Sequence, residues 1–103
     1  MNLSEYQKQA MATAVFPPQH HVVYTALGLG NEAGEVQGKV KKWLRGDGVS
    51  FDDIAAELGD VLWYLAALAA GLGFDLDAIA RANLAKLASR QARGVLNGSG
   101  DNR

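Results

Sequence analysis

Apolar residues recur at helical spacing along most of this chain, and no segment alternates apolar and polar residues for long enough to predict a strand. There is no internal repeat and no long low-complexity tract. The pattern predicts an all-α fold, a four-helix bundle-like single domain over residues 1–93, followed by a mobile Gly/Asn/Ser-rich C-terminal tail over 94–103.

Capping signals and helix breakers mark the expected boundaries. The first helix is expected from Ser4, which forms a capping-box pattern with Gln7, to about Val15, just before two prolines. The second is expected over residues 21–44, where a Gly-Asp-Gly sequence follows.

The third helix is expected to start after Ser50, which has Asp53 three residues later, and to end near Gly71. The fourth is expected to begin at Asp75 or Asp77 and to reach about Arg90. Its predicted apolar stripe consists of Leu76, Ile79, Leu84 and Leu87.

The segment from Val61 to Phe74 is uncharged, but its 14 residues fall short of the roughly 20 that a membrane span requires. It is expected to be a buried helix. Because the third helix is apolar almost all round after Asp60, burial on a second side, and hence self-association, is also expected.

The expected second helix contains four glycines, each of which lowers helix stability by about 1 kcal/mol relative to alanine. Either a neighbouring helix or ligand approaches the backbone closely, or the helix is irregular near its first two glycines. The glycines are Gly28, Gly30, Gly34 and Gly38.

Composition narrows the function classes for this chain of 103 residues. A net charge of -1 argues against binding a nucleic acid polymer. The lack of cysteine excludes disulfides, thiolate metal sites and a cysteine nucleophile. The first residues lack the basic-then-apolar pattern of a signal peptide, so a cytoplasmic location without membrane association is expected.

Two pairs of carboxylates lie inside the apolar helices, Glu32 with Glu35 and Glu57 with Asp60. Residues three apart share nearly the same helix face, so each pair presents two oxygen ligands side by side. One such pair is most often a solvated surface, but two pairs on packed helices would crowd four carboxylates and need a cation. Oxygen ligands favour Mg²⁺, with Mn²⁺ as a possible substitute, and such ions commonly bind substrate phosphates.

The order Glu-x-x-Glu and then Glu-x-x-Asp resembles the signature of the MazG-like nucleoside triphosphate pyrophosphohydrolases, within the all-α NTP pyrophosphatase superfamily. The resemblance covers about residues 3 to 93. It is carried by three segments, Glu32–Val36, Glu57–Tyr64 and Asn83–Arg90, and the closing residues, Gly98–Arg103, are also similar.

The resemblance implies Mg²⁺-dependent cleavage between the α and β phosphates of (d)NTPs, giving (d)NMP and pyrophosphate in nucleotide-pool house-cleaning. It implies that Glu32, Glu35, Glu57 and Asp60 are the metal ligands and catalytic carboxylates. Glu35 is preferred as the general base, although metal ligand and base cannot be separated from sequence. The resemblance also implies a homodimer or homotetramer.

Cations are candidates for binding the substrate phosphates. Lys39 and Lys42 follow Glu35 on the same face of the second helix, although a solvated basic helix end explains them equally well. Asn83, Lys86 and Arg90 form one polar stripe on the fourth helix, and the resemblance implies that this stripe faces the triphosphate.

Trp63 and Tyr64 are candidates for stacking on the base, against the commoner role of such aromatics in a core. Two alternatives stay open. A dUTP-selective or phosphoribosyl-nucleotide pyrophosphohydrolase would share the metal cluster and differ in its pocket. A non-catalytic helical interaction module would carry solvated acidic pairs or a structural metal.

Overall fold

The structure is a computed structural model that describes all residues from 1 to 103. It contains helices and no strand, which confirms the all-α prediction. The observed bounds of the last three helices agree with the predicted ones to within two residues. The elements are α1 (Leu3–Met11), the 3₁₀ turn η1 (Pro18–His20), α2 (His21–Leu44), α3 (Phe51–Gly71) and α4 (Leu76–Ala92).

Helix α1 is shorter than predicted and is capped differently. Asn2 is its N-cap, and the Asn2 side chain accepts a hydrogen bond of 2.8 Å from a backbone N–H of the first turn. The helix ends at Met11. The predicted capping box of Ser4 and Gln7 is wrong, because both side chains reach across to the start of α4. There the Ser4 hydroxyl donates to the Asp75 carboxylate at 2.6 Å.

Gln7 joins three helices at one buried point. Its side-chain nitrogen donates to the carbonyl oxygens of Ala66 in α3, at 3.1 Å, and Phe74, at 3.0 Å. Its side-chain oxygen accepts from the backbone N–H of Leu76 at 3.0 Å. Asp75 lies at the N-cap position of α4, as predicted, but makes no capping hydrogen bond there. Gln7 therefore satisfies the first turn of α4 from another helix.

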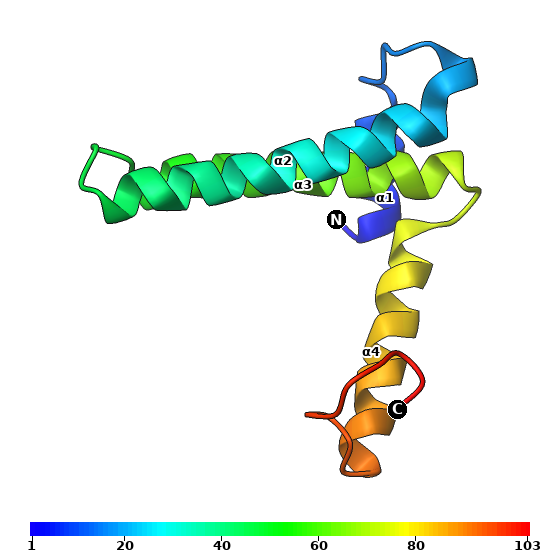
Figure 1. The fold of residues 1–103 in the computed structure, drawn as a ribbon. Coiled ribbons are helices and arrows are strands. Elements are labelled where there is room, and N and C mark those ends of the chain that lie inside the picture. Colours follow the sequence, from blue (N-terminus) through cyan, green and yellow to red (C-terminus); the bar gives the residue numbers. More distant parts are fainter.

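Helices α2 and α3 form an antiparallel hairpin (Figure 1). The predicted capping box at the start of α3 is confirmed, with Ser50 N–H donating to the Asp53 carboxylate at 2.8 Å and Asp53 N–H donating to the Ser50 hydroxyl at 3.1 Å. Gly46 and Gly48 in the connecting turn have φ of 77° and 82°, a conformation that favours glycine.

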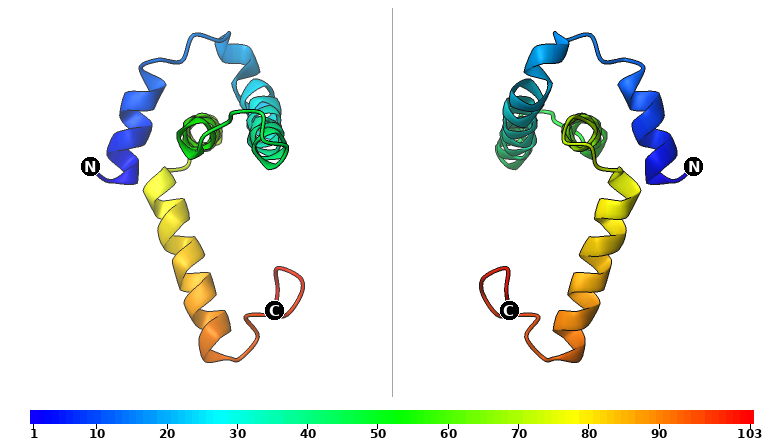
Figure 2. Two further views of the ribbon diagram at one scale, coloured as in Figure 1. Left: turned by 90° about the vertical axis from the view of Figure 1, so that its left-hand side faces the viewer. Right: turned by 90° about the vertical axis from the view of Figure 1, so that its right-hand side faces the viewer.

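Helix α4 turns away from the hairpin instead of packing along it, as two further views show (Figure 2). A closed bundle therefore does not form within one chain. Of the predicted apolar stripe only Leu76 is buried, whereas Ile79, Leu84 and Leu87 are exposed. The stripe was predicted to face a core, but the first turn of α4 alone reaches α1 and α3.

Helix α3 is less buried than predicted. Ala66, Ala67 and Ala69 are buried, but Leu65 is exposed, as is Leu72, which follows the helix. By length and composition alone α3 could also cross a membrane, which is weak evidence because apolar helices of soluble proteins pass the same test.

Candidate metal centre

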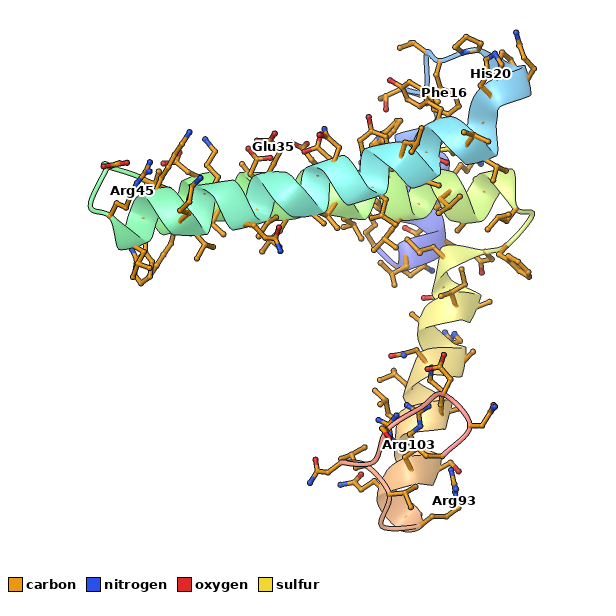
Figure 3. The ribbon with its side chains drawn as sticks, in the orientation of Figure 1. Phe16, His20, Glu35, Arg45, Arg93 and Arg103 are labelled. Carbon is orange, nitrogen blue, oxygen red and sulfur yellow. The ribbon has the colours of Figure 1, made fainter.

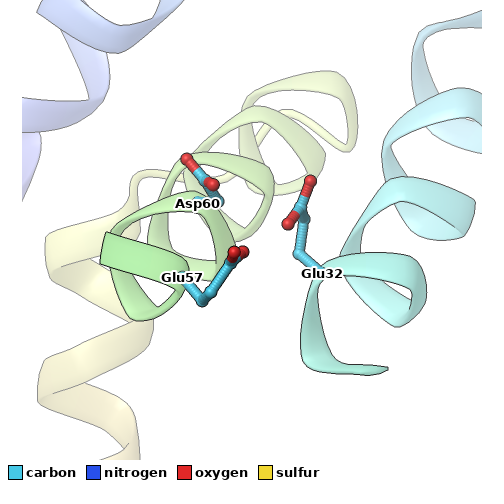
Figure 4. Close-up of side chains that lie close together, drawn as sticks. All are labelled: Glu32, Glu57 and Asp60. Atoms are coloured by element: carbon cyan, nitrogen blue, oxygen red, sulfur yellow. The ribbon is translucent and has the colours of Figure 1, made fainter. Parts of the chain in front are cut away.

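Three of the four predicted carboxylates converge in the middle of the hairpin. Glu32 of α2 points toward Glu57 and Asp60 of α3 (Figure 4). Each offers one oxygen, and the three atoms all lie within 4.8 Å of one another. Ligand oxygens on an octahedral Mg²⁺ lie about 3 Å apart in adjacent positions and about 4 Å apart in opposite ones, given Mg–O distances of about 2.1 Å. Small side-chain movements would therefore let the three carboxylates share one ion.

The electrostatics of this cluster also fit a cation. Partial burial, followed by the negative charges of Asp60, Glu57 and Glu35, raises the pKa of Glu32 above its usual value. The ion pairs of the chain lie elsewhere, between Arg and Asp side chains of the α2–α3 turn and of α4, so no basic side chain pairs with these carboxylates. A divalent cation would offset the repulsion that the fold imposes.

Glu35 lies outside the group of three. It is exposed at the edge of α2 (Figure 3), yet close enough for its charge to contribute to the raised pKa of Glu32. Residues three apart on a helix differ by about 60° around its axis, so when Glu32 points at α3 its neighbour points to one side. The predicted roles of Glu35 as ligand and base stay predictions.

The backbone of α2 approaches α3 closely at one glycine, which helps place the carboxylates opposite one another. A Cβ atom at Gly28 would lie 2.0 Å from Cε1 of Tyr64, so the Tyr64 ring occupies the space that a side chain would fill. The close approach expected for the four glycines is thus found at Gly28. At Gly30, Gly34 and Gly38 it is not found, because these glycines have no such neighbour within 4 Å.

An aromatic cluster adjoins the carboxylates. Trp63 donates from its indole N–H to the Thr13 hydroxyl at 2.8 Å and meets the Tyr64 ring edge-on at 5.0 Å between centroids. Phe16 stacks on Tyr24 at 4.9 Å. The structure thus places Trp63 and Tyr64 in one aromatic cluster with Phe16 of the α1–α2 connection. A helical sequence pattern does not reveal that this connection contributes to the cluster.

Tyr24 is a neighbour of the site that sequence reasoning missed. It lies eight residues before Glu32 in α2, about 80° around the helix axis from it, so the spacing gave no clear signal, and its ring lies 6.4 Å from that of Tyr64 between centroids. Burial, followed by Tyr24 and then by Glu32 and Asp60, raises the pKa of Tyr64. Burial and the charge of Asp60 also raise the pKa of Tyr6. Two phenol groups therefore border the acidic cluster.

The predicted phosphate-binding cations are divided between two parts of the molecule. Lys39 is half-buried and Lys42 exposed in the C-terminal part of α2. Asn83 and Lys86 are exposed on α4, which leads away from the hairpin. Arg90 is only 5% exposed and donates to the carbonyl oxygen of Asp101 at 2.8 Å. One chain alone does not bring the α4 stripe to the carboxylates, and its role in substrate binding stays a prediction.

Comparison with known proteins agrees with the acidic signature. Residues 21–95 match the family described as the MazG nucleotide pyrophosphohydrolase domain, and this range includes both acidic pairs. The chain is 46% identical over 114 aligned residues to the Gene 37 protein of Mycobacterium phage L5, with 100% of each chain covered. No solved structure matches. The chain belongs to the MazG nucleotide pyrophosphohydrolase family.

Proposed function

We propose that this protein hydrolyses (d)NTPs between the α and β phosphates with Mg²⁺, for which Mn²⁺ can substitute, and so releases (d)NMP and pyrophosphate in nucleotide-pool house-cleaning. The observation that carries the proposal is the convergence of Glu32, Glu57 and Asp60 within the region that matches the family. A cluster of oxygen ligands without thiolates suits a hard cation that also binds phosphate.

Glu32, Glu57 and Asp60 would hold the ion, with Glu35 beside them. The bound ion would supply charge stabilisation for the phosphate oxygens and a water of lowered pKa. Glu35 is exposed and outside the group of three, so its carboxylate is open to accept a proton from water. We therefore assign it the role of general base.

The substrate would extend along the hairpin in both directions from the carboxylates. Lys39 and Lys42 follow Glu35 toward the C-terminal end of α2 and would offset the charge of the phosphates. Trp63 and Tyr64 lie on the other side, in the aromatic cluster, where a base would find planar surfaces for stacking.

A second chain would complete this arrangement, and we propose that the protein is a homodimer or homotetramer. Within one chain α4 carries Asn83, Lys86 and Arg90 away from the carboxylates. Packing of α4 against another copy would give these residues access to a site.

The test is metal-dependent release of pyrophosphate from a panel of NTPs and dNTPs that includes dUTP and a phosphoribosyl nucleotide. We expect Glu57→Gln to lower turnover more than about 100-fold, because even outer-shell partners of a metal typically cost about 10- to 100-fold. Asp52→Asn is the matched control, because Asp52 is an exposed acid in the first turn of the same helix and lies outside the cluster. This variant should retain nearly full activity.

Circular dichroism of both variants establishes that α3 is intact. If no substrate gives metal-dependent pyrophosphate, or if Glu57→Gln and Asp52→Asn have equal activity, the proposed reaction at this cluster is wrong. The ranking of substrates in the panel also separates a general house-cleaning enzyme from one selective for dUTP or for phosphoribosyl nucleotides.

A further inference from the structure

The Thr13 side chain, two residues after α1, connects α1 to α3 through two hydrogen bonds. Its hydroxyl donates to the carbonyl oxygen of Ala10 at 2.7 Å, and the hydroxyl oxygen accepts from the indole N–H of Trp63 at 2.8 Å. The Thr13 backbone N–H also donates to the Ala10 carbonyl, at 3.0 Å. Ala10 is buried in one core cluster with Ala66 and Ala69 of α3. The oxygen that meets Trp63 therefore has a fixed position.

The direction of each of these bonds is fixed as well. An indole N–H can only donate a hydrogen bond. Because the hydrogen of the Thr13 hydroxyl is directed at Ala10, its oxygen lone pairs are left for the Trp63 N–H. Each bond of such a chain polarises the next and strengthens it. The nitrogen edge of the Trp63 ring therefore has one preferred direction.

Two aromatic rings also orient the indole of Trp63. Phe16, which lies beside the start of α2 (Figure 3), is 6.3 Å away between centroids, with 86° between the ring planes. Tyr64 is 5.0 Å away, with 83° between the planes. Both are edge-to-face arrangements, which aromatic pairs favour. With the Thr13 hydrogen bond, these contacts determine the plane of a ring that follows Asp60 by three residues on nearly the same face of α3.

The hydrogen bond between Trp63 and Thr13 contributes orientation more than stability. Thr13 is exposed and Trp63 is only partly buried, so a water molecule could replace the hydroxyl as the acceptor of the indole N–H. Such a water has no fixed position, whereas the Thr13 oxygen does. The bond therefore selects one orientation of the indole.

We propose that Thr13 is a positioning residue for the nucleotide base, because it fixes the plane of Trp63, on which the base stacks. This inference rests on the proposed function, which assigns base stacking to Trp63 and Tyr64. The side-chain hydrogen bonds of Thr13 go to Ala10 and Trp63 and not to the carboxylates, so Thr13 controls affinity for the nucleotide and not the chemical step. Thr13 also precedes residues 21–95, the region that matches the family.

The first test compares Thr13→Val with Thr13→Ser. Valine has nearly the shape of threonine but no hydroxyl, whereas serine keeps the hydroxyl. The assay is pyrophosphate release with Mg²⁺ from the nucleotide that the wild type cleaves best. Thr13→Val should raise KM by about 3- to 10-fold, the scale of one hydrogen bond, and should leave kcat within about 2-fold. Thr13→Ser should restore KM to within about 2-fold of wild type.

The second test asks whether Thr13 acts through the indole N–H. Trp63→Phe keeps an aromatic face but removes the donor, so adding Thr13→Val to Trp63→Phe should change KM no further. If Thr13→Val raises KM equally with tryptophan and with phenylalanine at position 63, Thr13 does not act through Trp63 and the inference is wrong.

NMR reads the hydrogen bond without turnover. The chain has two tryptophans, so a proton–nitrogen correlation spectrum contains two indole N–H signals. Trp43 is the internal control, because it packs on Phe51 at the hairpin turn, at 5.5 Å between centroids. Thr13→Val should move the Trp63 signal upfield and leave the Trp43 signal in place. Thr13→Ser should leave both signals close to their wild-type positions.

The outcomes separate this inference from the proposed function. A wild-type chain that releases no pyrophosphate from any nucleotide in the panel overturns the proposed reaction, and this inference with it. An active wild type whose KM is unchanged in Thr13→Val overturns the inference alone, as does a Trp63 signal that does not move. A variant that loses thermal stability and kcat at unchanged KM also overturns it, because Thr13 would then serve only the packing of α1.

Discussion

A methyl group added at Gly28 would collide with the ring of Tyr64. The Cβ atom of an alanine would lie 2.0 Å from Cε1 and 2.5 Å from Cδ1 and Cζ, whereas ordinary contacts are 3.4–4 Å. The ring would have to retreat by more than an ångström, and Trp63 lies against it at 5.0 Å between centroids. Gly28→Ala should therefore disturb the contact that sets α2 against α3.

Two opposing terms determine the size of the effect. Overpacking costs about 1–3 kcal/mol, whereas replacing glycine by alanine inside a helix stabilises it by about 1 kcal/mol. Gly30→Ala provides the control, because its Cβ would have no neighbour within 4 Å and only the second term applies. The helix term cancels in the comparison, so Gly28→Ala should be less stable than Gly30→Ala by about 1–3 kcal/mol.

Thermal unfolding followed by circular dichroism measures this difference. One kcal/mol shifts Tm by about 4–8 °C in a domain of this size, so the two variants should differ by at least about 4 °C. Because Tyr64 borders the carboxylates, Gly28→Ala should also lower pyrophosphate release relative to Gly30→Ala. Equal Tm values, or a higher Tm for Gly28→Ala, would refute the reasoning about the close approach.

The remaining predictions concern stability. Gln7→Leu removes the three hydrogen bonds of the buried Gln7 side chain, each of which contributes about 0.5–1.5 kcal/mol. The free energy of unfolding, measured with urea, should therefore fall by about 2–4 kcal/mol. Gln9 is exposed on the same helix, so Gln9→Leu should change the free energy of unfolding by less than about 0.5 kcal/mol. A similar loss of stability in both variants would contradict the stabilising role of the Gln7 hydrogen bonds. The backbone N–H of Ser50 holds the pKa of Asp53 below its usual value. The charged carboxylate therefore stabilises the fold above the ordinary Asp pKa of about 3.9, and this contribution is lost as the pH falls below that value. Asp53→Asn should therefore be less stable than wild type at about pH 7, and the difference should shrink as the pH falls below the ordinary pKa of Asp. A difference that stays constant as the pH falls would exclude the effect.

The features that sequence predicted correctly depend on neighbours in the chain. The capping box of Ser50 and Asp53 lies within a single helical turn, and its hydrogen bonds form as expected. The spacing of the acidic residues likewise identified which helix faces meet. It could not decide how α2 is rotated, and that rotation brings Glu32 into the cluster and leaves Glu35 at its edge.

The features that sequence missed depend on contacts across the chain. Gln7 has the same local pattern as a capping residue of its own helix, but its partners lie 59 to 69 residues away. The apolar stripe of α4 was predicted to be buried, but beyond Leu76 it is exposed in the chain, because periodicity marks an apolar face without saying what covers it. Tyr24 escaped notice because its role depends on the ring of Tyr64 opposite it.

The hydrogen bonds of Gln7 also determine in which order parts of the chain can fold. Helix α1 precedes α3 and α4 along the chain, and the carbonyl and N–H groups that its glutamine binds belong to residues some 60 to 70 positions later. The first turn of α4 is satisfied only once α1 has docked on α3, a contact of high sequence separation that forms slowly. Since the matched family region begins at residue 21, α1 lies outside it while setting the direction of α4. Helix α4 is therefore expected to take its direction late in folding, after α1 has docked on α3.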